Sequence, residues 1–388
     1  MEGTNQKQVV LSYALLMYMV GIVLLITLIP FQFYIPHEIS SIWKIYLNDS
    51  ITNIFLFLPL GFLFQVSRRR HKDTLCVGAL GFGLLVSVVI EITQVFLLWR
   101  YTSAIDVVTN GLGAWVGALI FTFIKRHVNQ TRIAGVFALE LPLMNLVYLL
   151  IPLIWLNGLS AGHEVSRVWL LVVLGLFGAI VLSSVYIHRL RYVERLSSNK
   201  VTFLAMGWFF VAALPALAHF PMQGILCGIG VGIIVRLLTA FQKKTIQAER
   251  RFELPTLKRL LPLYIFYLLL LAMWPTTVAF GEWQETGHFQ ELMFNDRVVF
   301  IFRFVEYIAA FTLLGYIVAE MRGRKQESVT KILLWIVVLS SSCLIGIVFL
   351  KGHTPFSLLT FVEVALITGA GLYGGMIYRL QLAAIQRI

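Results

Sequence analysis

Charge and cysteine are both scarce in this sequence. Asp, Glu, Lys and Arg together make up 13% of the 388 residues, about half of the ~25% that a soluble domain carries. There are 3 cysteines, and each lies in an apolar stretch, where a thiol behaves as a small core residue: Cys76, Cys227 and Cys343. We therefore expect neither a disulfide framework nor a thiolate metal site.

Sequence motifs of the common cofactor and metal enzymes are also missing. The chain contains no HExxH, CxxC or P-loop pattern, and no glycine fingerprint of a dinucleotide site in the required context. We expect no cofactor and no metal, and we assign no catalytic residue. An enzymatic activity is disfavoured by these absences, but it stays open.

Long apolar stretches dominate the rest of the sequence. Apolar residues make up 59% of the chain, and stretches of roughly 20 residues, long enough to cross a bilayer as a helix, recur along its length. We predict an all-α, polytopic transmembrane helical bundle of about twelve spans. The predicted span cores are 11–30, 51–67, 74–99, 104–124, 133–156, 168–187, 201–219, 222–240, 261–280, 299–319, 330–350 and 356–378.

Basic residues gather after every second predicted span, and they account for most of the net charge of +12. The clusters begin at Arg68, Lys125, Arg189, Lys243, Arg322 and Arg379. Because cytoplasmic loops are enriched in Lys and Arg, we predict a multi-pass protein of the cytoplasmic (cell) membrane with both termini in the cytoplasm. The charge is thus a topology signal, and nucleic acid is not expected as a partner. The first apolar stretch lacks a basic leader, which favours a retained helix.

Polar side chains interrupt the apolar sequence near the predicted outer ends of spans two to four. A charge inside the bilayer is costly, so an intramembrane charged residue marks a functional site by default. Helical spacing places Glu91 and Gln94 on one face and Asp106 and Asn110 on another, and a short turn carrying Arg100 joins the two helices. We predict a single ligand-binding pocket in the outer half of the membrane, formed by Asn53, Glu91, Gln94, Arg100, Asp106 and Asn110.

Structural roles for the same residues stay open. Glu91 and Arg100 could form an ion pair that only fixes helix packing, although such a pair is poorly repaid in stability. Asp106 and Asn110 could stabilise the start of span four, because an acid near a helix N-terminus is favoured by the helix dipole. Asn53 could cap the start of span two.

The last third of the chain resembles the first. Residues 58–75 align with 312–329, and residues 109–121 align with 366–378. The second pair contains small residues four apart, Gly113 with Gly117 and Gly371 with Gly375, a step that lets helix backbones approach closely in lipid. We predict a parallel repeat in a 4+4+4 organisation. The predicted units are a first four-helix unit, 1–128, a central linking unit, 129–259, and a degenerate second copy of the first unit, 260–388.

The two copies differ in chemistry. The polar set of the first copy has largely apolar counterparts in the second, which keeps Arg303, Glu306 and Glu363 instead. We expect these acids to pair within the second copy and to have a structural role. Glu140, two residues before a proline in predicted span five, is either a proton or ion relay or a solvated helix end.

The first four spans resemble the VanZ-like family of membrane proteins over residues 11–125. The order and spacing of the matching elements carry this resemblance: Ile29-Pro30-Phe31, Asn53, Phe57-Leu58-Pro59-Leu60-Gly61-Phe62, Ser87, Glu91, Gln94, Arg100, Asp106, Asn110, Gly113-Ala114 and Gly117. The family takes its name from a protein associated with low-level resistance to teicoplanin, a lipid-tailed glycopeptide. Family members often carry a further acid where this chain has Ser103.

Three functions are compatible with these features. The resemblance favours a non-enzymatic envelope protein whose outer pocket binds a membrane lipid or a lipid-tailed compound, and which alters glycopeptide resistance or acts in envelope homeostasis. The number of spans also suits a transporter or flippase of envelope lipids, with Glu140 as the coupling acid. The third function is a membrane enzyme acting on lipid-linked substrates, with Glu91 as base and Arg100 as phosphate clamp.

Overall fold

The structure is a computed structural model, and its described part consists of helices. Beyond the helices, Phe33 and Leu97 form one isolated antiparallel β-bridge, and no β-strand occurs among the described residues. The all-α class is therefore confirmed. The described residues are 2–29, 31–33, 35, 47–68, 75–97, 102–127, 143–163, 165–190, 197–241, 252–273, 294–350 and 358–385.

The chain divides into two compact units, which we describe one at a time. Unit 1 comprises Met1–Glu140 with Leu380–Ile388, and unit 2 comprises Leu141–Arg379. The boundary near residue 140 lies close to the end of the predicted first unit. The predicted three-part division stays a prediction.

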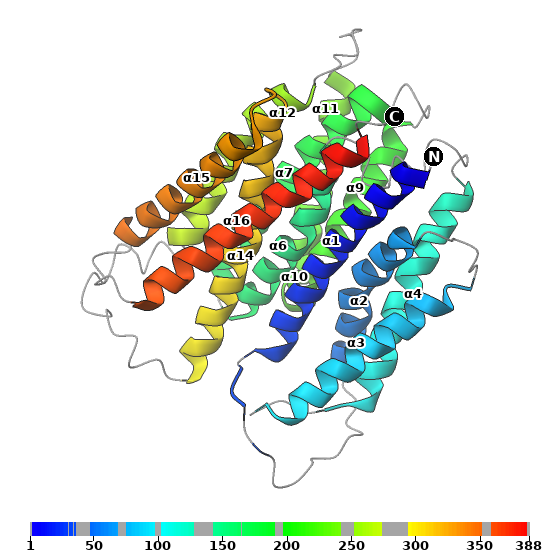
Figure 1. The fold of residues 1–388 in the computed structure, drawn as a ribbon. Helices are drawn as coiled ribbons and strands as arrows, with labels where there is room; N and C mark the ends of the chain where they lie inside the picture. Colours follow the sequence, from blue (N-terminus) through cyan, green and yellow to red (C-terminus); the bar gives the residue numbers. More distant parts are fainter. Residues whose placement is uncertain are drawn as a thin grey trace. The chain divides into compact units, whose positions relative to one another are not determined.

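Unit 1 is built around four helices (Figure 1): α1 (Glu2–Leu28), α2 (Leu47–Ser67), α3 (Val77–Val95) and α4 (Ala104–His127). Helix α4 packs against α2 and α3, and α1 packs against α2 and α3 as well. Helix α2 continues through Pro59, as transmembrane helices can when neighbouring groups satisfy the freed backbone.

Glycines bring α2 and α4 into direct backbone contact. A Cβ atom at Gly61 would overlap the carbonyl oxygen of Ala114, and one at Gly117 would overlap that of Leu58. Gly113 lies equally close to the carbonyl oxygen of Ile54. The absence of a side chain at these positions is therefore what permits this helix crossing.

Unit 2 contains the remaining described helices (Figure 1), which are α6 (Met144–His163), η1 (Val165–Trp169), α7 (Leu170–Val185), η2 (Tyr186–Leu190), α9 (Ser198–Ala212), α10 (Leu214–His219), α11 (Pro221–Phe241), α12 (Glu253–Met273), α14 (Phe294–Gly323), α15 (Val329–Leu350) and α16 (Leu358–Ile385). The last residues of α16, from Leu380 on, belong to unit 1. Buried residues make up 83% of the apolar segment of α6 and 72% of that of α14. These two helices pack against each other and form the centre of unit 2.

The crossing of α14 and α16 also depends on glycines. A Cβ atom at Gly315 would overlap the carbonyl oxygen of Gly371, and one at Gly374 would overlap that of Thr312. We predicted the close approach from Gly371 and Gly375. In the structure Gly375 faces the side chain of Ile336 on α15 instead, so the residues that meet α14 are three apart, not four.

Ten described helical segments are long and apolar enough to cross a membrane by length and composition. They correspond to predicted spans one to six and eight to eleven, so the chain is a multi-pass helical membrane protein. Predicted span twelve falls on α16, and the count of twelve stays a prediction.

Predicted span seven is interrupted in the structure. Helix α9 ends at Ala212, and the separate six-residue helix α10 starts at Leu214. Pro215 occupies the start of α10, where its missing N–H costs nothing, whereas inside one continuous helix it would remove a backbone hydrogen bond. The apolar stretch therefore forms two short helices.

Candidate functional site

The predicted site residues lie on three helices of unit 1. Asn53 lies in α2, Glu91 and Gln94 lie near the end of α3, and Asp106 and Asn110 lie in the first two turns of α4. Arg100 is outside the described residues, and so is the predicted ion pair between it and Glu91. Glu140 also lies outside them.

Glu91 joins the end of α3 to the start of α4. The backbone N–H of Ser103 donates a hydrogen bond of 2.8 Å to Glu91 Oε2. The carboxylate thus reaches the N-terminus of α4, where backbone N–H groups and the helix dipole favour negative charge. Glu91 is itself half-buried, so its charge is only partly removed from solvent.

Ser103 caps α4, a role that we had considered for Asp106. The Ser103 hydroxyl accepts a hydrogen bond of 3.4 Å from the backbone N–H of Asp106, and the Ser103 carbonyl accepts the first backbone bonds of the helix. Asp106 is the acidic residue of the first turn. A Ser-x-x-Asp sequence before an apolar stretch is a capping signal, and it could have identified Ser103 from the sequence.

Asn110 and Ser87 form a buried polar contact between α4 and α3. Asn110 Nδ2 donates a hydrogen bond of 2.8 Å to Ser87 Oγ, and the two residues are 4% and 0% exposed. Asn110 Oδ1 is buried and accepts no hydrogen bond from any described residue. A buried amide oxygen in this state costs free energy, so this atom can receive a donor from a ligand or a water molecule.

Gln94 has a structural contact on α1. Its Nε2 donates a hydrogen bond of 2.9 Å to the carbonyl oxygen of Thr27, which lies in the last turn of α1, where carbonyl groups lack partners within the helix. The bridge between Phe33 and Leu97 joins the segments that follow α1 and α3. The ends of these two helices are therefore tied together.

Asn53 is not joined to the other site residues by any described hydrogen bond. It is half-buried, and its neighbour Ile54 lies against Gly113 of α4, one turn after Asn110. Asn53 thus lies on the helix that covers the site, and its predicted place in the pocket wall stays a prediction.

The described site consists mainly of hydrogen-bond acceptors. The Glu91 carboxylate and Asn110 Oδ1 lie around the start of α4. Among the described residues, no group of three or more His, Cys, Asp or Glu side chains could hold a metal ion. The arrangement can therefore receive hydroxyl, amide or ammonium groups of a ligand.

Comparison with known proteins identifies the unit that carries this site. Residues 4–125 match the VanZ/LLP1 family model. Over 86 residues the chain is 28% identical to Protein VanZ of Enterococcus faecium, and this stretch covers 22% of the chain and 52% of that relative. The chain thus spans about half the length of the relative that it matches. No solved structure matches the chain. The part of the chain that folds into α1–α4 is a VanZ-like domain.

Proposed function

We propose that the VanZ-like domain binds a membrane lipid or a lipid-tailed compound at the polar site around Glu91. Through this binding, the protein would alter susceptibility to glycopeptides of the teicoplanin type or act in envelope homeostasis. The observation that carries the proposal is the half-buried carboxylate of Glu91 within an apolar helix, bonded to the Ser103 N–H at the start of α4. A charge at such a depth is rarely kept without a functional reason.

The chemistry of the site favours a ligand that donates hydrogen bonds. The described groups are the Glu91 carboxylate and the Asn110 amide oxygen, so a headgroup with hydroxyl or ammonium donors would match them. The surrounding helices present apolar side chains such as Val88 and Ile92 outward, which suits an acyl tail. A compound that combines a polar headgroup with a lipid tail satisfies both requirements.

We propose that this site faces the outside of the cytoplasmic membrane and that both termini are cytoplasmic. The support is the placement of basic clusters after every second predicted span. In this orientation the ends of α1 and α3 and the start of α4 lie in the outer half of the bilayer. Lipid-tailed compounds that reach the cell from outside would meet the site first.

The experiment compares Glu91→Gln with the wild-type protein in cells and after purification. Teicoplanin susceptibility is measured in cells expressing each form, and binding of teicoplanin is measured on the full-length protein in nanodiscs. We expect Glu91→Gln to lower binding about tenfold or more, because hydrogen bonds to a charged group contribute ~1.5–3 kcal/mol. Glu327→Gln, the same change at a partly exposed acid between α14 and α15, is the control and should leave both measurements unchanged. Unchanged binding and resistance in Glu91→Gln would contradict the proposal.

Two other functions make different predictions in the same cells. A membrane enzyme must generate a new lipid species, which lipid mass spectrometry of deletion and overexpressing cells would detect. A flippase would move a labelled lipid between the leaflets of proteoliposomes. A lipid-binding protein of the proposed kind should do neither.

We also propose that the VanZ-like helix pair occurs twice in the chain and its polar set once. The glycine contacts support this: Gly61–Ala114 and Gly117–Leu58 in unit 1 correspond, at one constant shift per helix, to Gly315–Gly371 and Gly374–Thr312 in unit 2. With the same shift, Asn110 corresponds to Ile367. The second pair would then keep the helix crossing without the ligand site.

A further inference from the structure

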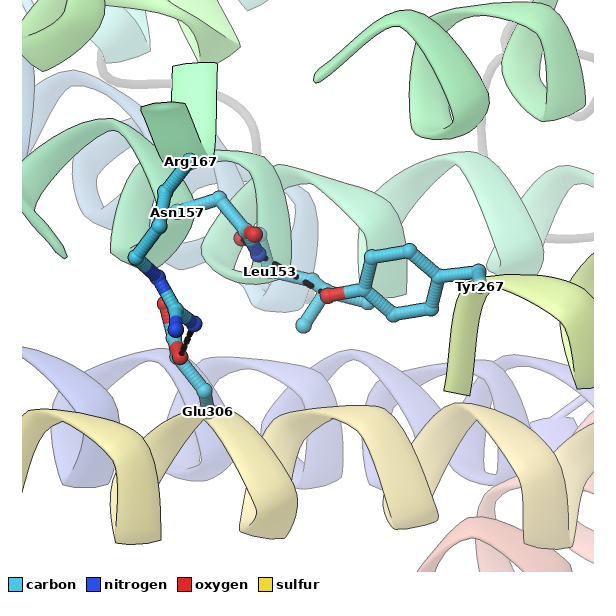
Figure 2. Close-up of polar contacts among 5 residues, drawn as sticks. All are labelled: Leu153, Asn157, Arg167, Tyr267 and Glu306. Carbon is cyan, nitrogen blue, oxygen red and sulfur yellow. Dashed lines mark hydrogen bonds and ion pairs between the residues drawn. The ribbon is translucent and has the colours of Figure 1, made fainter. Parts of the chain in front are cut away.

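A buried ion pair lies in the centre of unit 2. Arg167 of η1 and Glu306 of α14 are joined by a contact of 2.5 Å between Nη2 and Oε2, and their side chains are 2% and 0% exposed (Figure 2). We expected Glu306 to pair within the second copy. It instead pairs with Arg167, which lies in the central part of the sequence and was not predicted as a site residue.

Two uncharged polar residues complete a layer around this pair. Asn157 of α6 donates hydrogen bonds from Nδ2 to the Leu153 carbonyl oxygen at 2.8 Å and to the Tyr267 hydroxyl at 2.9 Å. Tyr267 of α12 interacts electrostatically with both charges. Figure 2 shows these side chains between α6 and α14, and they come from four separate elements of the unit.

The layer lies near one end of the apolar segments. Arg167 begins the segment Arg167–His188, and Glu306 lies in the second turn of Ile301–Gly323. At the opposite end of α14, Arg324 pairs with Glu320 at 3.4 Å while its side chain is 22% exposed. Arg324 can reach water, whereas Arg167 is enclosed.

Two buried polar atoms of α6 have no described hydrogen-bond partner. Asn157 Oδ1 and Ser160 Oγ are buried and bond to no described residue. Asn157 and Ser160 lie one turn apart on the same face of α6. Buried polar atoms of this kind are normally satisfied, so these two oxygens can accept hydrogen bonds from a group outside the chain.

The ion pair is also a poor way to stabilise unit 2. Removing two charges from water usually costs as much as their attraction returns, and ionisable groups inside a membrane usually mark substrate or ion pathways. Arg167 is carried by η1, a 3₁₀ segment between α6 and α7, as is common for connectors between helices. The arginine therefore lies outside the regular part of both long helices.

We propose that Arg167 binds a phosphate group in exchange for Glu306. The planar guanidinium suits two parallel hydrogen bonds to phosphate oxygens. Glu306, which loses this contact in an apolar environment, takes up a proton from water on a carboxylate oxygen. One anion and one proton thus enter together, and no net charge is added to the layer. Asn157 Oδ1 and Ser160 Oγ accept hydrogen bonds from hydroxyl groups next to the phosphate.

We assign the proton taken up with the phosphate to Glu306 by comparing the titratable groups around the ion pair. Arg167 faces it from η1 and Tyr267 from α12, and Arg303 and Tyr307 accompany it on α14. Of these, only Glu306 is an acid that is ionised in water near neutral pH. The site lies in unit 2, so this proposal does not rest on the function proposed for the VanZ-like domain.

The test uses the full-length protein in phosphatidylcholine nanodiscs, with empty nanodiscs as the blank. Dodecyl phosphate and inorganic phosphate are titrated in a calorimeter, each in two buffers of different ionisation enthalpy, which gives the number of protons taken up. We expect the wild-type protein to take up about one proton per phosphate bound. Binding of dodecyl phosphate alone would identify a lipid headgroup, and binding of both probes would identify a site open to free phosphate.

Variants of the pair should change binding in opposite directions. Glu306→Gln removes the competing carboxylate, so phosphate should bind about tenfold or more tightly and without proton uptake. Arg167→Gln should weaken binding about 30-fold or more. The doubly neutral Arg167→Gln/Glu306→Gln variant, which removes both charges of this pair, should fold and fail to bind, and it replaces Arg167→Gln in the test if that variant is unstable. Glu327→Gln is the matched control and should bind as the wild type does.

Three results would overturn the proposal. The first is that neither probe binds the wild-type protein. The second is that Glu306→Gln weakens binding or keeps the proton uptake, and the third is that the double variant binds as tightly as the wild type. A purely structural pair would give loss of stability in both single variants and no phosphate binding in any form.

Discussion

At the scale of single residues, Ser103 should stabilise α4 through its hydroxyl. Ser103→Ala removes the acceptor for the Asp106 N–H, and loss of a helix cap costs about 1 kcal/mol. The N–H that bonds Glu91 remains, so ligand binding should persist while the midpoint of thermal unfolding in detergent falls. An unchanged midpoint would show that the hydroxyl is not a cap.

The polar positions of the site could be predicted from the sequence, but several of their contacts could not. Glu91 and Asn110 could be found because charge and amide groups stand out in apolar sequence. The bond from Ser103 N–H to Glu91 could not, because a backbone donor leaves no trace in residue type. The contact of Gln94 with Thr27 depends on where α1 ends, which composition does not fix.

Asn110 and Ser87 should be energetically coupled. Asn110→Ala and Ser87→Ala each leave one partner buried and unsatisfied, at a cost of about 1–3 kcal/mol. The double variant removes both partners and should cost less than the sum of the two single changes. The free energies of unfolding of the four forms give this coupling, and additive values would contradict the hydrogen bond between the two side chains.

At the scale of helices, the length and apolarity of the sequence stretches predicted most of the long helices. Which residues meet where two helices cross depends on packing. Ten predicted spans have a counterpart of spanning length among the described helices. Predicted span seven is two helices instead of one, because Pro215 cannot donate the backbone hydrogen bond that a continuous helix needs at that position. The glycine contacts of α2 and α14 needed the structure, since only coordinates tell which of several small residues face a partner helix.

The two glycine crossings should respond alike to substitution. Gly61→Ala and Gly315→Ala each place a methyl group against a backbone carbonyl, and overpacking typically costs about 1–3 kcal/mol. A Cβ atom at Gly81 in α3 or at Gly346 in α15 would meet no atom within 4 Å. Alanine at these control positions should be neutral or slightly stabilising, because alanine favours helices.

Thermal unfolding of the purified variants measures the difference. If Gly61→Ala lowers stability and Gly315→Ala does not, the two crossings are not equivalent, and the proposed repeat loses its main support. Equal loss at both positions, with no loss at Gly81 or Gly346, is the expected result.

At the scale of the whole molecule, amino-acid composition predicted the class of protein, a helical membrane protein. The predicted orientation in the membrane rests on the distribution of basic residues between loops. The high apolar content and the scarcity of charge predicted a helical membrane protein, and the described helices agree. Orientation depends on the difference in Lys and Arg content between the two sets of loops. The division into two units at residue 140 depends on packing and could not be read from a sequence in which apolar spans follow one another throughout.

Reporter fusions should place both ends of the chain in the cytoplasm. A cytoplasm-active fluorescent protein fused after Ile388 should be bright, and a periplasm-active phosphatase at the same position should be inactive. The same pair of reporters before Met1 should give the same result. Activity of the phosphatase at either end would reverse the orientation or change the number of spans.

The ion pair in unit 2 has a consequence for synthesis of the protein. Arg167 and Glu306 are 139 residues apart in sequence, and at ~5–20 residues per second the ribosome needs roughly 7–28 s between them. During this interval the arginine has entered the membrane without its acid. Its place at the edge of an apolar segment allows the long side chain to extend toward the headgroups until α14 arrives. Assembly of this protein is therefore ordered in time, and the last step in enclosing the arginine is the insertion of α14.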